Sequence, residues 1–220
     1  MTKALILDFG GVVTRTLFET HDMTEAALGL PAGTLQWRGP FDPDNDPLWR
    51  DMQADRISER DYWLQRTRET GALLGKDWTR MSEFVRAARG GDPDAVIRPE
   101  FRAALDTARK AGVKLAILSN ELDLFYGEDF RDKLPFLDGF DVVIDATYTG
   151  ILKPDPRAYQ ACLDQLGLPA GDCVFVDDQM RNIEGARAVG LQTVHFNVRQ
   201  PRESYAEALS LLGLADGRMT

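Results

Sequence analysis

The sequence has little cysteine and histidine, and it has fewer basic than acidic side chains. Its two cysteines, Cys162 and Cys173, lack C-x-x-C spacing, so they predict neither a disulfide framework nor a zinc site, and we expect buried thiols. His21 and His195 stand apart from other ligand-type residues, which argues against a metal site or a triad built on them. The 26 basic and 35 acidic residues give a formal charge of −9, so we expect no nucleic-acid partner.

Long hydrophobic runs are also absent. Stretches such as LAILSN fall far short of the roughly 20 residues that span a bilayer, and the beginning, MTKALILDFGG, lacks a signal-peptide cleavage pattern. Neither G-x-G-x-x-G nor G-x-x-x-x-G-K-[ST] occurs, so the phosphate loops of dinucleotide-binding and P-loop folds are missing. Because a membrane-spanning run and a signal-peptide pattern are both missing, we expect a cytoplasmic protein without membrane association.

Short apolar runs of the buried-strand type recur at residues 4–8, 113–119, 142–144, 174–177 and 193–196. Segments with helical periodicity lie between the later runs, at 98–112, 154–167 and 180–190. Each of these segments ends in a glycine, as helices commonly do. The repeated β-α-β alternation predicts an α/β fold with a doubly wound, Rossmann-like parallel sheet.

The region after the first run breaks this alternation. Residues 17–97 contain no convincing strand, and amphipathic helices are expected at 19–30, 58–75 and 78–91. The intervening stretch 38–52 is dense in proline and aspartate, which favours a loop with a helical turn at its end. The sequence therefore predicts two domains, an α/β core at 1–16 and 98–220 and an inserted helical cap at 17–97.

Polar side chains follow four of the expected strands. In an open parallel sheet, ligands bind beyond the carboxyl ends of the strands, where the strand order reverses. Taken singly, each of these residues can also cap a helix or lie in a surface loop. Their joint occurrence at strand ends points to a site instead. The polar residues are Asp8, Ser119, Asn120, Lys153, Asp177 and Asp178, and the glycines Gly10 and Gly11 follow Asp8 in the same turn.

This set is suited to attack on a phosphoryl group. A carboxylate nucleophile is repelled by the phosphate, so the site needs cationic screening, which Lys153 offers. Asp8, Asp177 and Asp178 supply the hard oxygen ligands that Mg²⁺ prefers, and without a cation such close carboxylates would repel one another. The side chains of Ser119 and Asn120 and the N–H groups of the Gly10-Gly11 turn are expected to hold the transferring oxygens.

These segments resemble the haloacid dehalogenase-like (HAD) hydrolase superfamily, in the class whose helical cap follows the first motif. LILDFGGVV, AILSN, GILKPDPRAY and VFVDDQMRNIEGARAVG are similar to its four motifs in order. The resemblance implies that Asp8 forms an aspartyl-phosphate and that its carboxylate and the Gly10 carbonyl hold Mg²⁺. It implies Asp178 as a direct metal ligand and Asp177 as a direct or water-mediated one, with Ser119 and Lys153 gripping the phosphoryl oxygens.

Two further positions keep two interpretations each. The resemblance allows Asn182 to support the metal shell, although a polar residue in the first turn of a helix is an equally good interpretation. Tyr159 would fit a dehalogenase site but is more simply explained by packing.

Gly10 is the main departure from this resemblance. Phosphatases of the superfamily usually carry a second aspartate there, which protonates the leaving alkoxide, a contribution of about 10²–10⁴-fold. We expect a Mg²⁺-dependent hydrolase of a small phosphorylated metabolite. One alternative is a 2-haloacid dehalogenase, whose halide leaves unprotonated and near which Trp37 or Arg38 would lie. The other is a weakly catalytic binding or regulatory relative.

The insert itself does not identify a substrate. Its aromatic residues are expected to pack its interior, and substrate specificity is expected in the loop 36–50. These aromatic residues are Phe18, Trp37, Phe41, Trp49, Tyr62, Trp63 and Trp78.

Overall fold

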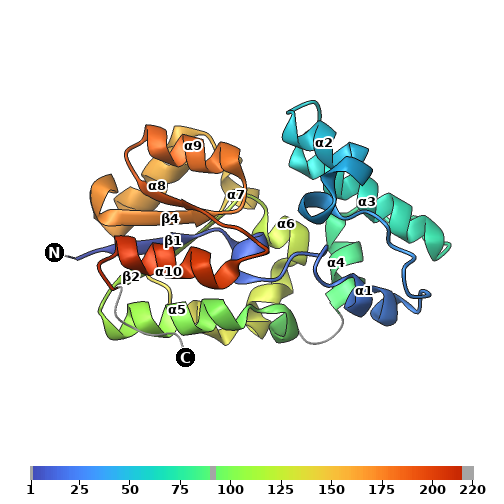
Figure 1. Ribbon diagram of the computed structural model, residues 1–220, viewed down its shortest axis with the longest axis horizontal. Coiled ribbons are helices and arrows are strands. Elements are labelled where there is room, and N and C mark those ends of the chain that lie inside the picture. Colours follow the sequence, from blue (N-terminus) through green and yellow to red (C-terminus); the bar gives the residue numbers. More distant parts are fainter. Residues whose placement is uncertain (1, 90–92, 215–220) are drawn as a thin grey trace. The chain divides into compact units, whose positions relative to one another are not determined.

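The computed structural model describes residues 2–89 and 93–214, which form two compact units (Figure 1). The first unit contains the described residues up to Arg15, then Asp94–Asp123, and those from Arg131 onward. The second contains the described part of Thr16–Pro93 together with Leu124–Phe130. The end of the expected helix 78–91 and the tail 215–220 of the expected core lie outside the described residues. The division into a catalytic core and a cap stays a prediction.

A five-stranded parallel sheet forms the centre of the first unit, with the strand order β3-β2-β1-β4-β5. The α/β doubly wound sheet expected from the sequence is thus confirmed, and each strand end differs from the expected one by at most one residue. The apolar runs predicted these strands well because both faces of the sheet are covered. The strands are β1 (Ala4–Leu7), β2 (Lys114–Ser119), β3 (Val142–Asp145), β4 (Cys173–Asp177) and β5 (Gln192–His195).

Helices cover both faces of this sheet (Figure 1). On one face lie α5 (Pro99–Lys110) and α10 (Pro201–Leu211), and on the other α8 (Pro156–Leu166) and α9 (Met180–Ala188). Helix α8 shows how the sequence sets such boundaries. The Asp155 side chain accepts a hydrogen bond from Arg157 N–H at the beginning, Pro156 occupies the first position, and Gly167 ends the helix at φ 66°.

The second unit is helical, as expected for the insert. It contains α1 (His21–Leu28), α2 (Pro47–Gln53), α3 (Glu59–Leu73) and α4 (Met81–Arg89). Helix α3 begins with a reciprocal cap in which Ser58 and Asp61 bond to each other's backbone N–H.

A later segment of the chain also belongs to the second unit. The short helix α6 (Leu122–Tyr126) runs into it, and the ring of Phe125 lies 5.5 Å from that of Trp63. Asp129 pairs with Arg86 of α4. Another short helix, α7 (Ala146–Thr149), follows β3 in the first unit.

Aromatic side chains fill the interior of the second unit. The Phe18 ring makes edge contacts with Trp37 at 5.5 Å and Trp49 at 5.3 Å between centroids, and Tyr62 packs against Trp63 at 5.1 Å. These five residues therefore pack against one another, as the sequence predicted, and Trp37 also lines a pocket.

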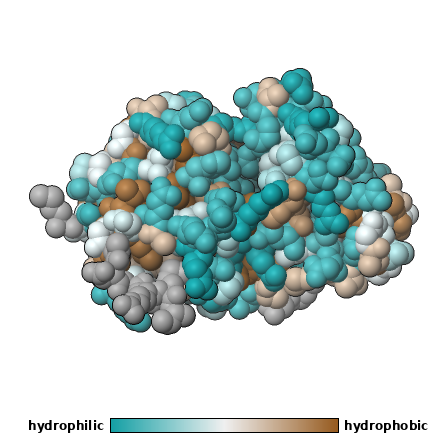
Figure 2. Space-filling view, in the orientation of Figure 1, coloured by the Kyte–Doolittle hydropathy of each residue, from teal (hydrophilic) through white to brown (hydrophobic). Residues whose placement is uncertain are grey.

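Hydrophilic side chains predominate on the face of the molecule shown in Figure 2, where apolar ones are scattered. Within residues 2–89 and 93–214, no helix has both the length and the apolar character that a membrane span requires. Cys162 and Cys173 are buried free thiols, as expected, and burial raises the pKa of Cys162 to about 12 and that of Cys173 to about 11.

Candidate functional site

The candidate site lies at the carboxyl ends of the neighbouring strands β1 and β4. Asp8 is the first residue after β1, and its N–H donates to the carbonyl of Val176 in β4 at 2.9 Å. Asp177 is the last residue of β4. The strand order reverses here, because the chain builds β2 and β3 on one side of β1 and then returns to place β4 on the other. This is the position at which open α/β sheets bind their ligands.

Lys153 joins the two aspartates. Its Nζ donates to Asp8 Oδ1 and to Asp177 Oδ2, each at 2.7 Å, although Lys153 lies far from both in sequence. The side chain of Lys153 is 1% exposed, that of Asp177 is fully buried, and that of Asp8 is 14% exposed. Asp178 extends the cluster, since one carboxylate oxygen from each of Asp8, Asp177 and Asp178 falls within 4.8 Å of the others. The sequence-predicted acids and lysine are thus brought together.

The cluster carries more negative than positive charge. Burial raises the pKa of Asp8 to about 6; the Lys153 ammonium works against this rise, and the Asp177 carboxylate adds to it. Burial alone would lower the pKa of Lys153, but the carboxylates of Asp177 and Asp8 raise it above its ordinary value. Lys153 is therefore a fixed cation, and its one ammonium faces two carboxylates, of which Asp177 is fully buried.

Asp177 has its hydrogen-bonding capacity taken up by the protein. Oδ1 accepts from Gln179 N–H at 2.8 Å and from Asn182 Nδ2 at 3.1 Å, while Oδ2 accepts from Lys153 Nζ and from Asn182 Nδ2 at 3.0 Å. A carboxylate has about four lone-pair sites, so Asp177 orients Lys153 and Asn182 and has little capacity left. The position of Asn182 was left open by the sequence, and the structure places its amide on Asp177.

The residues of the cluster fit a divalent cation. Hard carboxylate oxygens converge there, and their excess negative charge is of the sign that a metal ion compensates. Asn182 Oδ1 is buried and has no hydrogen-bond partner within the described part of the chain, although buried acceptors are nearly always satisfied. Asn182 Oδ1, which lies beside Asp177, is therefore suited to accept a hydrogen bond from a water molecule in the hydration shell of an ion. Asp8 and Asp178 are the carboxylates best suited to direct coordination.

The turn Phe9–Val13 continues from Asp8. Gly11 has φ 81°, a left-handed conformation that favours glycine, whereas Gly10 has an ordinary φ of −69° and ψ of 126°. Two residues that the sequence analysis missed hold this turn. Arg98 Nε donates to the Gly11 carbonyl at 2.9 Å, and Tyr205 OH donates to the Val12 carbonyl at 3.0 Å.

Both contacts span long sequence separations, so no local pattern could reveal them. The only local signal at Arg98 is its place directly before the proline that begins α5.

Ser119 and Asn120 follow at the end of β2. Ser119 is buried and pairs in register with Asp145 of β3, so it shares the edge of the sheet at which Asp8 lies. The Asn120 side chain bonds the backbone of Lys153, donating from Nδ2 to the carbonyl at 3.1 Å and accepting from the N–H at 2.7 Å. Contact of Asn120 with substrate stays a prediction.

The remaining residues singled out from the sequence have structural contacts. Tyr159 is buried, and its hydroxyl donates to the Asn182 carbonyl at 2.7 Å, in agreement with a packing role. His195 is exposed at the end of the edge strand β5, with Nε2 3.1 Å from the Asp178 carbonyl. In the second unit, the Arg38 guanidinium lies 3.1 Å from His21 Nδ1, and Trp37 packs against the His21 ring.

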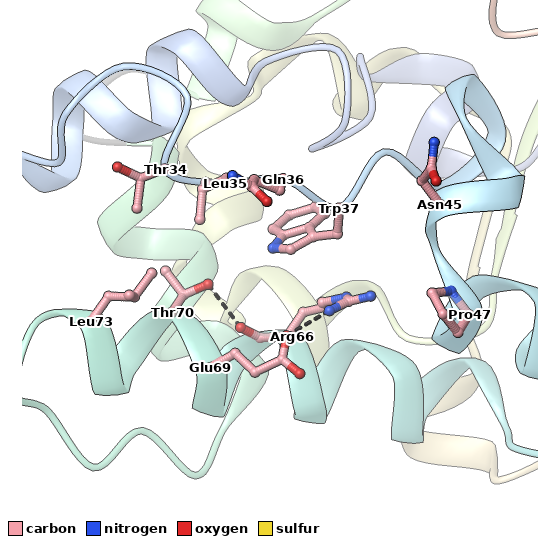
Figure 3. Close-up of a pocket in the computed structure, with 10 residues that line it drawn as sticks. All are labelled: Thr34, Leu35, Gln36, Trp37, Asn45, Pro47, Arg66, Glu69, Thr70 and Leu73. Carbon is pink, nitrogen blue, oxygen red and sulfur yellow. Dashed lines mark hydrogen bonds and ion pairs between the residues drawn. The ribbon is translucent and has the colours of Figure 1, made fainter.

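A pocket of about 350 Å³ lies within the second unit (Figure 3). Trp37 and Arg66 form part of its wall, and Glu69 and Thr70 come from the same face of α3 as Arg66. The Arg66 guanidinium bonds Asp46 and Glu69, each at 2.6 Å, so its charge is matched inside the unit. The other lining residues are Thr34, Leu35, Gln36, Asn45, Pro47 and Leu73.

Residues 2–190 match the family of haloacid dehalogenase-like hydrolases. The chain belongs to this family. The phosphatase MT3486 of Mycobacterium tuberculosis is 32% identical over 227 residues, covering 98% of this chain and 97% of that protein. Acyl-CoA dehydrogenase family member 10 of mouse is 29% identical over 213 residues, and the match covers 96% of this chain but 19% of that much longer protein.

The L-2-haloacid dehalogenase RSc1362 has a similar solved structure. Its TM-score is 0.59 at 22% identity, with 89% of this chain and 86% of that chain covered. At this identity the likeness shows the fold, and both phosphatases and dehalogenases of the family share it.

Proposed function

We propose that the protein is a phosphatase that hydrolyses a small phosphomonoester through an aspartyl-phosphate on Asp8. The observation that carries the proposal is the buried Lys153 ammonium, which lies 2.7 Å from both Asp8 and Asp177 in a cluster that contains more carboxylates than cations. The similarity to the mycobacterial phosphatase over nearly the whole of both chains supports it. An excess of buried carboxylate suits a site that takes up a metal cation and then a phosphate.

In the first step, an Asp8 carboxylate oxygen attacks phosphorus, the phosphorus–oxygen ester bond breaks, and the alcohol leaves. In the second, water attacks the same phosphorus, inorganic phosphate departs and Asp8 is regenerated. Lys153 and Ser119 bind the phosphoryl oxygens, and the N–H groups of the Gly10-Gly11 turn add donors. Asp8, Asp178 and the Gly10 carbonyl would hold Mg²⁺, and Asp177 would support the site by orienting Lys153 and Asn182. The ion would supply positive charge that stabilises the phosphoryl oxygens.

Gly10 carries no acid, so the leaving group takes its proton from solvent. We therefore expect activated aryl phosphates, whose phenolates leave unaided, to react faster than alkyl phosphates. The substrate class that follows is a small phosphomonoester.

The test is hydrolysis of p-nitrophenyl phosphate with Mg²⁺ or with EDTA, run beside halide release from a 2-haloacid. Asp8→Asn should abolish turnover while the fold is retained. Asp106→Asn, an exposed aspartate in α5, is the matched control and should keep wild-type activity. Metal-independent halide release, or equal phosphatase activity in Asp8→Asn and the wild type, would overturn the proposal.

A further inference from the structure

The side chain of Asn120 holds the backbone of Lys153 through two hydrogen bonds, which we call the Asn120 clamp. Nδ2 donates to the Lys153 carbonyl at 3.1 Å, and Oδ1 accepts from the Lys153 N–H at 2.7 Å. One planar amide therefore pairs with both backbone polar groups of a single residue that lies 33 positions later. The clamp ties the loop after β2 to the loop that carries Lys153.

Lys153 needs an anchor of this kind. Its side chain is long and flexible, and fixing it in the buried cluster costs rotamer entropy. The ammonium must still reach Asp8 and Asp177 at once, each at 2.7 Å. The next residue, Pro154, has no N–H with which to tie the loop on that side. A shift of the Lys153 backbone would therefore be passed on to the ammonium.

We propose that Asn120 is a positioning residue, which sets the backbone of Lys153 so that the ammonium meets Asp8 and Asp177. The two clamp bonds point the donor and the acceptor of the amide at opposite ends of the Lys153 backbone. The kinetic part of this inference rests on the proposed function, whereas the structural part rests on the hydrogen bonds alone.

The kinetic experiment is a double-mutant cycle of Asn120→Ala with Lys153→Met, measured on p-nitrophenyl phosphate. A misplaced catalytic group typically costs about 10²-fold, so Asn120→Ala should lower kcat about 10- to 100-fold and change KM less than about 3-fold. In the double variant, the loss should barely exceed that of Lys153→Met, because both changes remove the same ammonium placement. Additive losses, or a rise in KM without a fall in kcat, would overturn the clamp.

Two further variants serve as comparisons. Asn120→Asp keeps the acceptor for Lys153 N–H but places an oxygen against the Lys153 carbonyl, so it should be at least as slow as Asn120→Ala while preserving the shape of the side chain. Asn197→Ala is the matched control, because Asn197 bonds residues of its own loop, including Gln200 and Arg199. It should leave kcat unchanged.

An NMR measurement separates the clamp from the proposed function. In protein labelled with ¹⁵N-lysine, the buried Lys153 ammonium should give a slowly exchanging signal that Lys153→Met removes. Asn120→Ala should shift or broaden this signal, and Asn197→Ala should not. If the wild type hydrolyses no phosphomonoester but the signal responds to Asn120→Ala, the function fails and the clamp stands. If the signal ignores Asn120→Ala, the clamp is wrong whatever the activity.

Discussion

Each unit contains a buried ion cluster, and the two clusters differ in their balance of charge. In the second unit, Arg66 pairs at 2.6 Å with the fully buried Asp46 carboxylate and with Glu69, whose side chain is 41% exposed, so the cation faces one buried carboxylate. Tyr62 OH at 3.0 Å and the N–H groups of Gly39 at 3.1 Å and Trp49 at 3.0 Å complete its hydrogen bonds. In the first unit, the single ammonium of Lys153 faces two carboxylates.

The difference distinguishes a structural cluster from a reactive one. Asp46 ties the loop before α2 to α3, and every charge there has its partner within the fold. The cluster at Asp8 has a carboxylate in excess, which burial makes costly and which raises the pKa of Asp8 to about 6. That excess is removed when the site takes up a cation.

Removing the balanced partner should have the largest effect on stability. Asp46→Asn leaves the buried Arg66 guanidinium with only the partly exposed Glu69 carboxylate, and breaking a buried ion pair costs about 3–5 kcal/mol. Urea unfolding followed by tryptophan fluorescence measures this, since Trp37 and Trp49 lie in the same unit.

The matched control is Asp51→Asn, whose partner Arg56 has a side chain 62% exposed. A surface pair of this kind is worth about 0–1 kcal/mol. If Asp46→Asn costs no more than Asp51→Asn, the Asp46 cluster is not structural.

Adding a carboxylate to the unbalanced cluster should change the reaction and not the fold. Gly10 has an ordinary φ of −69°, so Gly10→Asp avoids the strain expected at Gly11, and it introduces an acid beside Asp8. Alkyl phosphates should gain about 10- to 100-fold relative to aryl phosphates, a part of what general acids contribute. Rates with both ester classes at saturating Mg²⁺ measure this.

Gly171→Asp is the control, because Gly171 lies in open space before β4 and away from the strand ends that form the site. Equal changes for both ester classes in Gly10→Asp would show that the added acid donates no proton.

His21 should give the second unit a smaller, pH-dependent loss of stability. Burial, with Arg38 as a second cause, lowers the pKa of His21 to about 4; Glu25 and Asp22 oppose this, and Arg66 adds to it. From pH 6.5 down to about 4, the unfolded chain therefore binds a proton that the folded chain refuses. The contribution of His21 to stability therefore falls by roughly 1–3 kcal/mol as the pH is lowered through that window, and it is constant above pH 6.5.

Unfolding of His21→Phe between pH 4 and pH 7 tests this expectation. The variant should lose most of the dependence in that window. A pH profile as steep as that of the wild type would assign the loss to other groups.

The sequence predicted the parts of the fold whose signals are local. The strands are continuous apolar runs because the sheet is buried on both faces, and helix α8 carries its own cap and terminal glycine. The acids and Lys153 were predictable because residues at the carboxyl ends of parallel strands must meet. Helix α10 was not predicted, nor was the return of Leu124–Phe130 to the second unit.

The contacts that support the site were also missed. Arg98 and Tyr205 bond the turn after Asp8, and Asn120 bonds Lys153, across separations of 87, 193 and 33 residues. Such partners are chosen by the tertiary fold, and neither periodicity nor residue spacing encodes them.

The unfolding free energy of Asp8→Asn in EDTA at pH 7 to 8 tests the central claim most directly. Replacing the Asp8 carboxylate removes one of the clustered negative charges and keeps the ion pair of Lys153 with the buried Asp177. The account predicts that Asp8→Asn is inactive yet more stable than the metal-free wild type by about 1–3 kcal/mol, the range that the raised pKa of Asp8 implies. An Asp8→Asn variant that is less stable than the wild type in EDTA, or that still turns over substrate, would contradict it.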